Sequence, residues 1–295
     1  MPLAALLLIL VSAFLQAGLN FLIKGSDRKI ALATGASLLR MIVFFPVIVW
    51  GRGLLGAGDL HITAWSWVGI VACGVVGMVF HLLVATAYDR EDLSIVYPVT
   101  RSFGPIFILI FALILLGERV SLLGFVGILV TIFGSYVVHL PSFRASDLYL
   151  PFKAFKSKPF LFSMGGGACT AIYSLINKRN LEMVDPLTLY YLIIICMTIF
   201  LTLFLLARGR LAEIREEVNH NLRSLLLIGF MGFISAALFL FALKMSKVSY
   251  LGSARNISIV FGVILGSFFL REGSGRIRFV ASLLILAGIF LLSVG

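Results

Sequence analysis

The sequence predicts an all-α integral membrane protein with ten transmembrane helices, arranged as two inverted five-helix repeats. Three observations predict this fold. Of the 295 residues, 61% are hydrophobic and only 13% are charged, whereas soluble domains carry about 25% charged residues. The apolar residues form blocks of roughly 20 positions, the length that crosses a hydrocarbon core about 30 Å thick. Like residues also recur at a constant offset between the two halves of the chain.

Each apolar block is bounded by charged residues, Gly or Pro. The first block begins at Leu3 without a basic segment before it and continues to Ile23, so we interpret it as a span rather than as a cleaved signal peptide. The longest connector, residues 141–158, separates a first repeat at 1–140 from a second at 159–295. The ten predicted spans cover residues 3–23, 30–50, 65–87, 93–116, 120–140, 159–177, 187–207, 222–243, 248–270 and 276–294.

An internal duplication explains the division into two halves. Four pairs of like residues are separated by 154 positions: Lys24 and Lys178, Arg101 and Arg255, Glu118 and Glu272, and Gly134 and Gly288. Because each half has an odd number of spans, the second half must enter the membrane in the opposite sense. Inverted repeats of this kind are typical of secondary transporters.

The basic residues predict the orientation and the location of the chain. The net charge is +11, but the Lys and Arg residues lie mostly in short connectors, where they indicate topology rather than nucleic-acid binding. The odd-numbered connectors carry 15 of them and the even-numbered connectors carry 6. This bias predicts a multi-pass protein of the cytoplasmic (inner) membrane with both termini outside. The three cysteines lie inside apolar blocks, so no zinc site, other metal site or cofactor is expected.

Two arginines within spans are the leading candidates for substrate binding. Arg101 in the fourth span and Arg255 in the ninth occupy equivalent positions of the two halves. Pro98 and Pro105 flank Arg101 and predict a helix that is kinked or opened there. Interrupted helices at matching positions of inverted repeats indicate a binding site. Since arginine is a permanent cation with a fork of donors, the pair predicts an anionic or zwitterionic substrate. The competing interpretation is that each arginine reaches a membrane interface.

Further polar residues in the spans are candidates for a polar route or for interhelical hydrogen bonds. Arg40 in the second span has Ile194 at its repeat position, and for Arg40 structural anchoring and cavity lining remain equally open. His81 is a candidate proton relay, although a hydrogen-bonded structural histidine is the more frequent case. The remaining candidates are four residues spaced four apart on single helix faces and two tyrosines beside the arginines: Gln16, Asn20, Tyr173, Asn177, Tyr97 and Tyr250.

Two acidic residues at the ends of spans are candidates for a gate. Glu118 follows the fourth span and Glu272 follows the ninth. They are expected to pair with Arg119 and Arg271, or with connectors of the other half, and so to hold one face of the protein shut. Exposed pairs of this kind usually contribute little free energy.

A family resemblance rests on short motifs in a fixed order. The segment 115–119, Leu-Leu-Gly-Glu-Arg, is followed by Gly127 and Gly134, and the segment 270–272 by Ala281 and Gly288. Together with the segment 93–105, these motifs resemble the repeat of the EamA-type transporters of the drug/metabolite transporter superfamily. The resemblance implies a ten-helix carrier of small molecules with cytoplasmic termini, opposite to the charge bias. It also implies that Asn256 replaces a frequent acid, leaving Arg255 available to a ligand.

The function expected from these features is secondary transport of a small organic solute by alternating access, with no catalytic residues. A lipid-carrier flippase would use the same fold with a different cargo. A membrane-embedded prenyl- or lipid-modifying enzyme has support only from the acidic cluster 89–92, which has no acidic counterpart in the second half. The expected partners are a small-molecule substrate and the lipid bilayer. Nucleic acid is excluded, and the oligomeric state is undetermined by the sequence.

Overall fold

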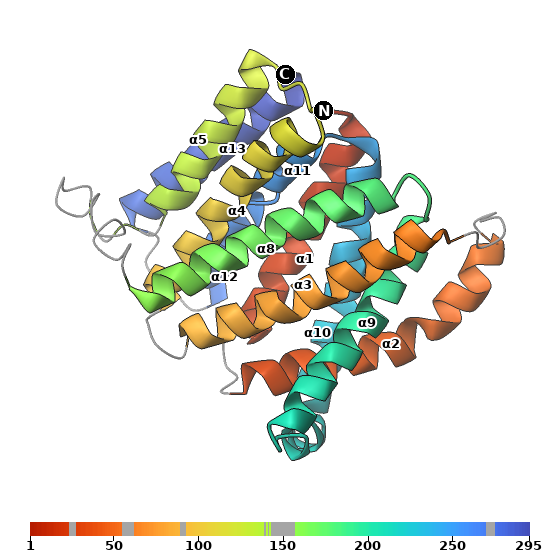
Figure 1. Ribbon diagram of the computed structural model, residues 1–295. Helices are drawn as coiled ribbons and strands as arrows, with labels where there is room; N and C mark the ends of the chain where they lie inside the picture. The colour runs from red at the N-terminus through yellow and green to blue at the C-terminus, as the bar shows by residue number, and fades with distance from the viewer. Residues whose placement is uncertain are drawn as a thin grey trace.

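The computed structural model of the chain describes residues 1–23, 28–54, 62–88, 93–138, 140, 142, 157–269 and 275–295. Every regular element in these ranges is an α-helix (Figure 1). The elements are α1 (Leu3–Ile23), α2 (Lys29–Leu54), α3 (Ala64–Tyr88), α4 (Leu93–Leu115), α5 (Leu122–Val137), α8 (Lys158–Asn180), α9 (Pro186–Ala207), α10 (Ala212–Met245), α11 (Val248–Ala254), α12 (Ile257–Phe269) and α13 (Arg276–Val294).

These helices fit the ten predicted spans. Seven helical segments in the described residues are long and apolar enough to cross a membrane, and the shorter apolar stretches Leu3–Leu19, Ser102–Leu115 and Leu122–Val137 supply three more. The ninth span is divided into α11 and α12. The all-helical membrane fold is therefore confirmed.

Local sequence explains where several helices begin. Ser121 precedes α5 and accepts the N–H of Gly124, and Ser157 precedes α8 and accepts the N–H of Phe160. Asp185 does the same for α9, where Pro186 occupies the first turn. Side chains of this type satisfy backbone donors that a helix start leaves open, and proline costs nothing there because its missing N–H would have no helical partner.

The helix that contains the predicted eighth span, residues 222–243, starts ten residues before that span. The helix α10 has 34 residues and contains one non-helical residue, Asn221, at φ −126° and ψ 23°. The stretch before it carries Glu213, Glu216 and Glu217, so no long apolar run marks it in the sequence. On the exposed surface Glu216 forms an ion pair with Arg28, which raises the pKa of that guanidinium above its ordinary value. This polar segment therefore packs beside the start of α2 instead of adding to the apolar span.

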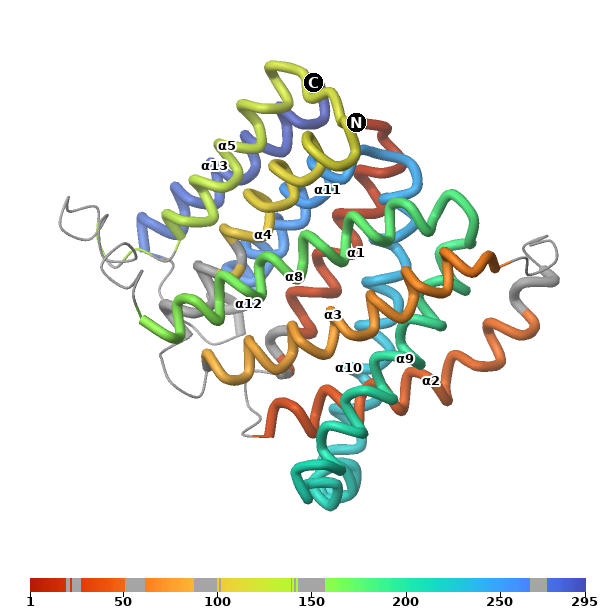
Figure 2. Tube along the Cα trace, in the orientation of Figure 1, coloured from red at the N-terminus to blue at the C-terminus, as the bar shows by residue number. Residues whose placement is uncertain are grey.

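The contacts between helices follow the two-repeat pattern. The first span contacts the eighth (α1 with α10), and the third contacts the sixth (α3 with α8), as inversion of the halves requires (Figures 1 and 2). The contacts α2 with α10 and α9 with α3 are related in the same way. In the contacts α2 with α9 and α5 with α13, the two helices are repeat equivalents of each other, so the repeat relates each of these contacts to itself. This reciprocity confirms two inverted five-helix repeats, while the exact boundaries at 140 and 159 stay predictions.

Glycines set the close approach of α5 and α13. A Cβ atom built on Gly127 would lie 2.8 Å from the carbonyl oxygen of Gly288, and one on Gly134 would lie 2.9 Å from the amide nitrogen of Ile285. Small residues of this kind let two backbones pack directly against each other in a membrane. The outer surface is apolar: Trp65, Leu122 and Ile114 are 85%, 80% and 72% exposed. Such side chains suit contact with lipid.

Both chain ends lie on one face of the molecule. The N-terminal ammonium group donates a hydrogen bond to the carbonyl of Ser293, 3.1 Å away, and the labels N and C lie close together in Figure 1. An even number of spans requires the two ends to share a face. We call this the termini face.

Candidate functional site

The interruption of the ninth span positions Arg255. The helix α11 ends at Ala254 and α12 begins at Ile257, so Arg255 and Asn256 form the junction. Backbone bonds there run over three residues, from the N–H of Asn256 to the carbonyl of Ser253 and from the N–H of Ser258 to the carbonyl of Arg255. This tightening is typical of a 3₁₀ turn. It places a charged residue at a local break inside the membrane.

The Arg255 guanidinium contacts both halves of the protein. Its Nη2 donates to Oε1 of Gln16 on α1 at 3.0 Å, and its Cζ lies 4.5 Å from the centre of the Phe239 ring on α10. The cation is thus held between an amide and an aromatic face, and a contact of the second kind is attractive even without a carboxylate. Gln16 and Arg255, both predicted site residues, lie together.

Tyr173 and Asn177 on α8 border the same region. Tyr173 lies beside Asn177 and within electrostatic range of Tyr190 and Arg255. Asn177 is fully buried and its Oδ1 accepts a weak bond from Cys73 Sγ at 3.7 Å. Its Nδ2 has no hydrogen-bond partner among the described residues. The Asn177 Oδ1 atom therefore links α8 to α3, and its Nδ2 atom is an amide donor within the bundle.

Arg40 and His81 lie near each other. Arg40 Nη1 is 3.5 Å from the Tyr190 hydroxyl, and Nη2 is 3.5 Å from the carbonyl of Ile228. His81 lies within electrostatic range of Arg40 and meets the Phe80 ring edge-on at 5.6 Å. These positions leave the relay role of His81 a prediction.

Two predicted site residues have structural contacts. Asn256 Nδ2 donates to Ser135 Oγ on α5 at 2.8 Å, and both side chains are buried. The Tyr250 hydroxyl accepts the N–H of Ser121 at 3.2 Å. Asn256 therefore anchors the start of α12 to α5, and Tyr250 joins α11 to the start of α5, while their roles in substrate binding stay predictions.

The expected kink or opening of the fourth span at Pro98 and Pro105 stays a prediction. The helix α4 runs as one element through Pro98 and Pro105. A proline removes one helical donor without removing the others, and α4 is supported along its length by α8, where Gly167 allows Gly104 to approach closely. The side chains of Asn20, Tyr97, Pro98 and Arg101, and the whole of Glu272, lie outside the described residues.

Glu118 connects the two halves at the termini face. Its carboxylate accepts the N–H of Val248 at 2.7 Å, the N–H of Ser249 at 3.2 Å and the Ser249 hydroxyl at 2.6 Å. It therefore caps the start of α11, where a negative charge is favoured. The partners are backbone amides and one hydroxyl of the other half rather than Arg119. Lys247 in turn donates to the carbonyl of Arg119 at 2.6 Å.

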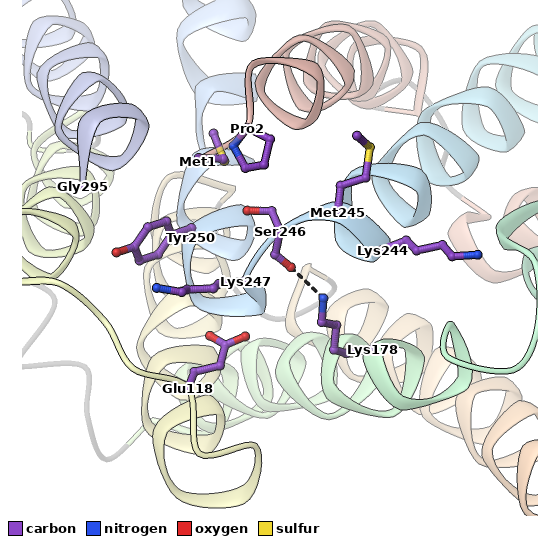
Figure 3. A pocket seen from close by; sticks show the side chains of 10 residues that line it. All are labelled: Met1, Pro2, Glu118, Lys178, Lys244, Met245, Ser246, Lys247, Tyr250 and Gly295. Carbon is purple, nitrogen blue, oxygen red and sulfur yellow. Dashed lines mark hydrogen bonds between the residues drawn. The ribbon is translucent and has the colours of Figure 1, made fainter.

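Lys178 adds a third contact at this face. Its Nζ donates to the carbonyls of Leu243 and Ser246, each at 2.8 Å. We call Glu118, Lys178 and Lys247, with the carbonyl and amide groups they bind, the termini-face clasp. Beside the clasp is an open pocket of about 480 Å³, seen in Figure 3 with Lys178 pointing to Ser246. Its other lining residues include Met1, Tyr250 and Gly295.

Comparison with known proteins agrees with this architecture. The sequence model described as the EamA-like transporter family matches residues 3–140 and residues 157–294. The chain belongs to this family. The EamA-like transporter also matches a solved structure entitled "Crystal structure of protein", with 16% identity, a TM-score of 0.70, and coverage of 100% of this chain and 98% of that one. At this identity the similarity shows the fold alone. A search of the curated proteins gave no match.

Membership of the family makes this chain a multi-pass membrane transporter.

The structure also adds residues to the site that the sequence analysis did not select: Phe239, Tyr190 and Lys178. Of these, only Lys178 has a signal in the sequence, because it recurs as Lys24 in the first repeat. Phe239 and Tyr190 look like ordinary apolar-face residues, and only the packing of α9 and α10 brings them to the cationic side chains. The acidic cluster 89–92, the sole support for an enzyme, lies outside the described residues.

Proposed function

We propose that this transporter moves a small organic anion or zwitterion across the cytoplasmic membrane by alternating access, with its termini outside. The observation that carries the proposal is the position of Arg255. Its guanidinium lies at a helix break in the ninth span and contacts α1 of one half and α10 of the other. A charged group in a membrane interior is costly, so its presence there favours a functional role.

The chemistry of this position favours an acidic ligand. The apolar spans contain no Asp or Glu, so the protein sequence supplies no carboxylate at that depth. Gln16 offers an amide and Phe239 a ring face, and neither neutralises a positive charge. A carboxylate or phosphate of the substrate would form charge-assisted hydrogen bonds with the guanidinium.

The termini-face clasp supports alternating access. Glu118 and Lys247 join the end of α4 to the start of α11, and therefore join one repeat to the other. We propose that these contacts close the termini face and break when that face opens. The repeat assigns Glu272 the corresponding role at the opposite face, which remains a prediction from the sequence alone.

Ligand-induced thermal stabilisation of the purified protein tests the substrate class. A ligand that binds only the folded state raises its stability. We expect stabilisation by carboxylates, phosphates or amino acids, and we expect Arg255→Gln to abolish it. Arg208→Gln is the matched control. Arg208 also lies over a phenylalanine ring, with its Cζ 5.4 Å from the centre of Phe204, but it lies after the end of α9 and away from Gln16 and Phe239.

The contrary outcomes are distinct. Stabilisation by amines alone, or by acids equally in the Arg255→Gln variant, would remove the basis for an anion site. Stabilisation only by amphiphiles would favour the flippase instead. Transport of the same ligand into vesicles then tests movement rather than binding.

A further inference from the structure

Arg40 lies in the middle of α2 with weak partners. It is eleven residues from the start of the helix, about 16 Å along it at 1.5 Å per residue. Both of its terminal nitrogens have contacts at 3.5 Å, one with the Tyr190 hydroxyl and one with the Ile228 carbonyl. This distance is beyond the usual range of a good hydrogen bond. Its Nε is buried and meets no acceptor among the described residues.

The fold does not require a cation at this position. Ile194 of α9 occupies the position in the second repeat that is equivalent to Arg40 in the first, and Ile194 is fully buried. The neighbouring glycines show the same asymmetry. A Cβ on Gly232 of α10 would lie 2.5 Å from Arg40 Nη2. Gly77 of α3 matches Gly232 at an offset of 155, one residue more than the other repeat pairs, and a Cβ on Gly77 would lie 2.9 Å from Met197 Sδ. The second span therefore packs a guanidinium against a glycine of the other half, whereas the seventh span packs an apolar side chain at the matching place.

The helix α10 fixes the register between Arg40 and Arg255. The Arg40 guanidinium lies against Gly232, and the Arg255 guanidinium lies over Phe239. Seven residues separate these two positions, which is close to two turns. Both cations therefore lie on one face of α10, about 10 Å apart along its axis.

Two tyrosines link the cationic positions. The Tyr190 hydroxyl contacts Arg40, and its ring packs 5.3 Å from the Phe233 ring, one residue beyond Gly232. Tyr173 on α8 lies within electrostatic range of both Tyr190 and Arg255. Two tyrosines in the neighbourhood of the two guanidinium groups suit the body of an organic molecule.

We propose that Arg40 is a second anion-binding residue of the transport site, and that the substrate is an elongated organic acid with an acidic group near each end. This inference rests on the proposed function, because it assigns Arg255 to one acidic group and Arg40 to the other. Arginine suits both positions, since it stays protonated and binds carboxylates in a forked geometry.

Binding of two matched acid series to the purified full chain tests the inference. The dicarboxylates succinate, glutarate, adipate and suberate are compared with the monocarboxylates butyrate and hexanoate by calorimetry. We expect a dicarboxylate of intermediate length to bind tightest. Arg40→Gln should weaken its binding at least tenfold and leave the monocarboxylates within twofold, whereas Arg255→Gln should weaken both series. Arg208→Gln should change neither series.

A conservative variant guards against misfolding. Arg40→Lys keeps the charge and should retain the preference for dicarboxylates if Arg40→Gln fails to fold. Equal weakening of both series by loss of Arg40, or no preference for dicarboxylates in the wild type, overturns the two-ended substrate. Unchanged binding of every acid in Arg40→Gln makes Arg40 an anchor, while the anion site at Arg255 stands. Binding of amines and of no acid overturns the proposed function as well.

Discussion

Replacing Glu118 with alanine should loosen the start of α11. The change removes the acceptor for two backbone N–H groups and for the Ser249 hydroxyl. Loss of a helix cap costs about 1 kcal/mol, and loss of a negative charge near a helix start costs a further ~0.3–1 kcal/mol. Adding the side-chain hydrogen bond, we expect about 2 kcal/mol in favour of local opening. This energy corresponds to a factor of about 30 in the open population.

Hydrogen exchange followed by mass spectrometry measures this population directly. Amides that exchange by local opening do so in proportion to the open population. We expect exchange of the peptide 247–254 to accelerate about 30-fold in Glu118→Ala and about fivefold in Glu118→Gln, which keeps an acceptor but loses the charge. Glu213→Gln is the control, because Glu213 forms an exposed pair with Arg210 and an exposed pair contributes little. Exchange in Glu118→Ala within twofold of the wild type would refute the role of the clasp.

Three further predictions concern packing, the clasp and topology. Gly288→Val should lower stability by about 1–3 kcal/mol through overpacking, since its Cβ would collide with Thr131, whereas Gly262→Val enters open space and should be tolerated in the same thermal unfolding assay. Lys178→Met should cost about 1–2 kcal/mol by removing two backbone contacts, and an unchanged unfolding temperature would contradict this. A reporter active only in the cytoplasm should be silent when fused at Gly295, and activity there would reverse the assigned orientation.

The helices were predictable because membrane length and apolar composition are local properties. The predicted span at 276–294 coincides with α13, and the span at 3–23 coincides with α1. The polar start of α10 was missed, since residues 212–220 carry charges that end an apolar run while still forming a helix. Local hydropathy therefore finds the spans and not their polar extensions.

The candidate site was predictable only in part because its contacts are long-range. Arg255 was identified from its charge, but its partner Gln16 is 239 residues away and no local pattern indicates the pairing. Glu118 is a candidate gate from its place at the end of a span, but two of its three partners are backbone amides, which almost every residue has. A break at Pro98 and Pro105 stays a prediction, since proline is the usual local signal. The break at the Arg255–Asn256 junction has no proline to mark it, because the tertiary contacts of both side chains hold the turn.

The reciprocal helix contacts indicate which parts of the molecule need not move. If the two access states exchange the roles of the halves, a contact that the repeat relates to itself is the same in both states. The seams α2–α9 and α5–α13 have this property, so in the proposed cycle they would form a fixed frame. The repeat relates the contact between α4 and α8 to the contact between α1 and α12, and the first is more extensive than the second in this structure. In the other access state, the second contact would be the more extensive one. A covalent cross-link across either seam of the frame should thus leave the cycle running, whereas one across α4–α8 should arrest it.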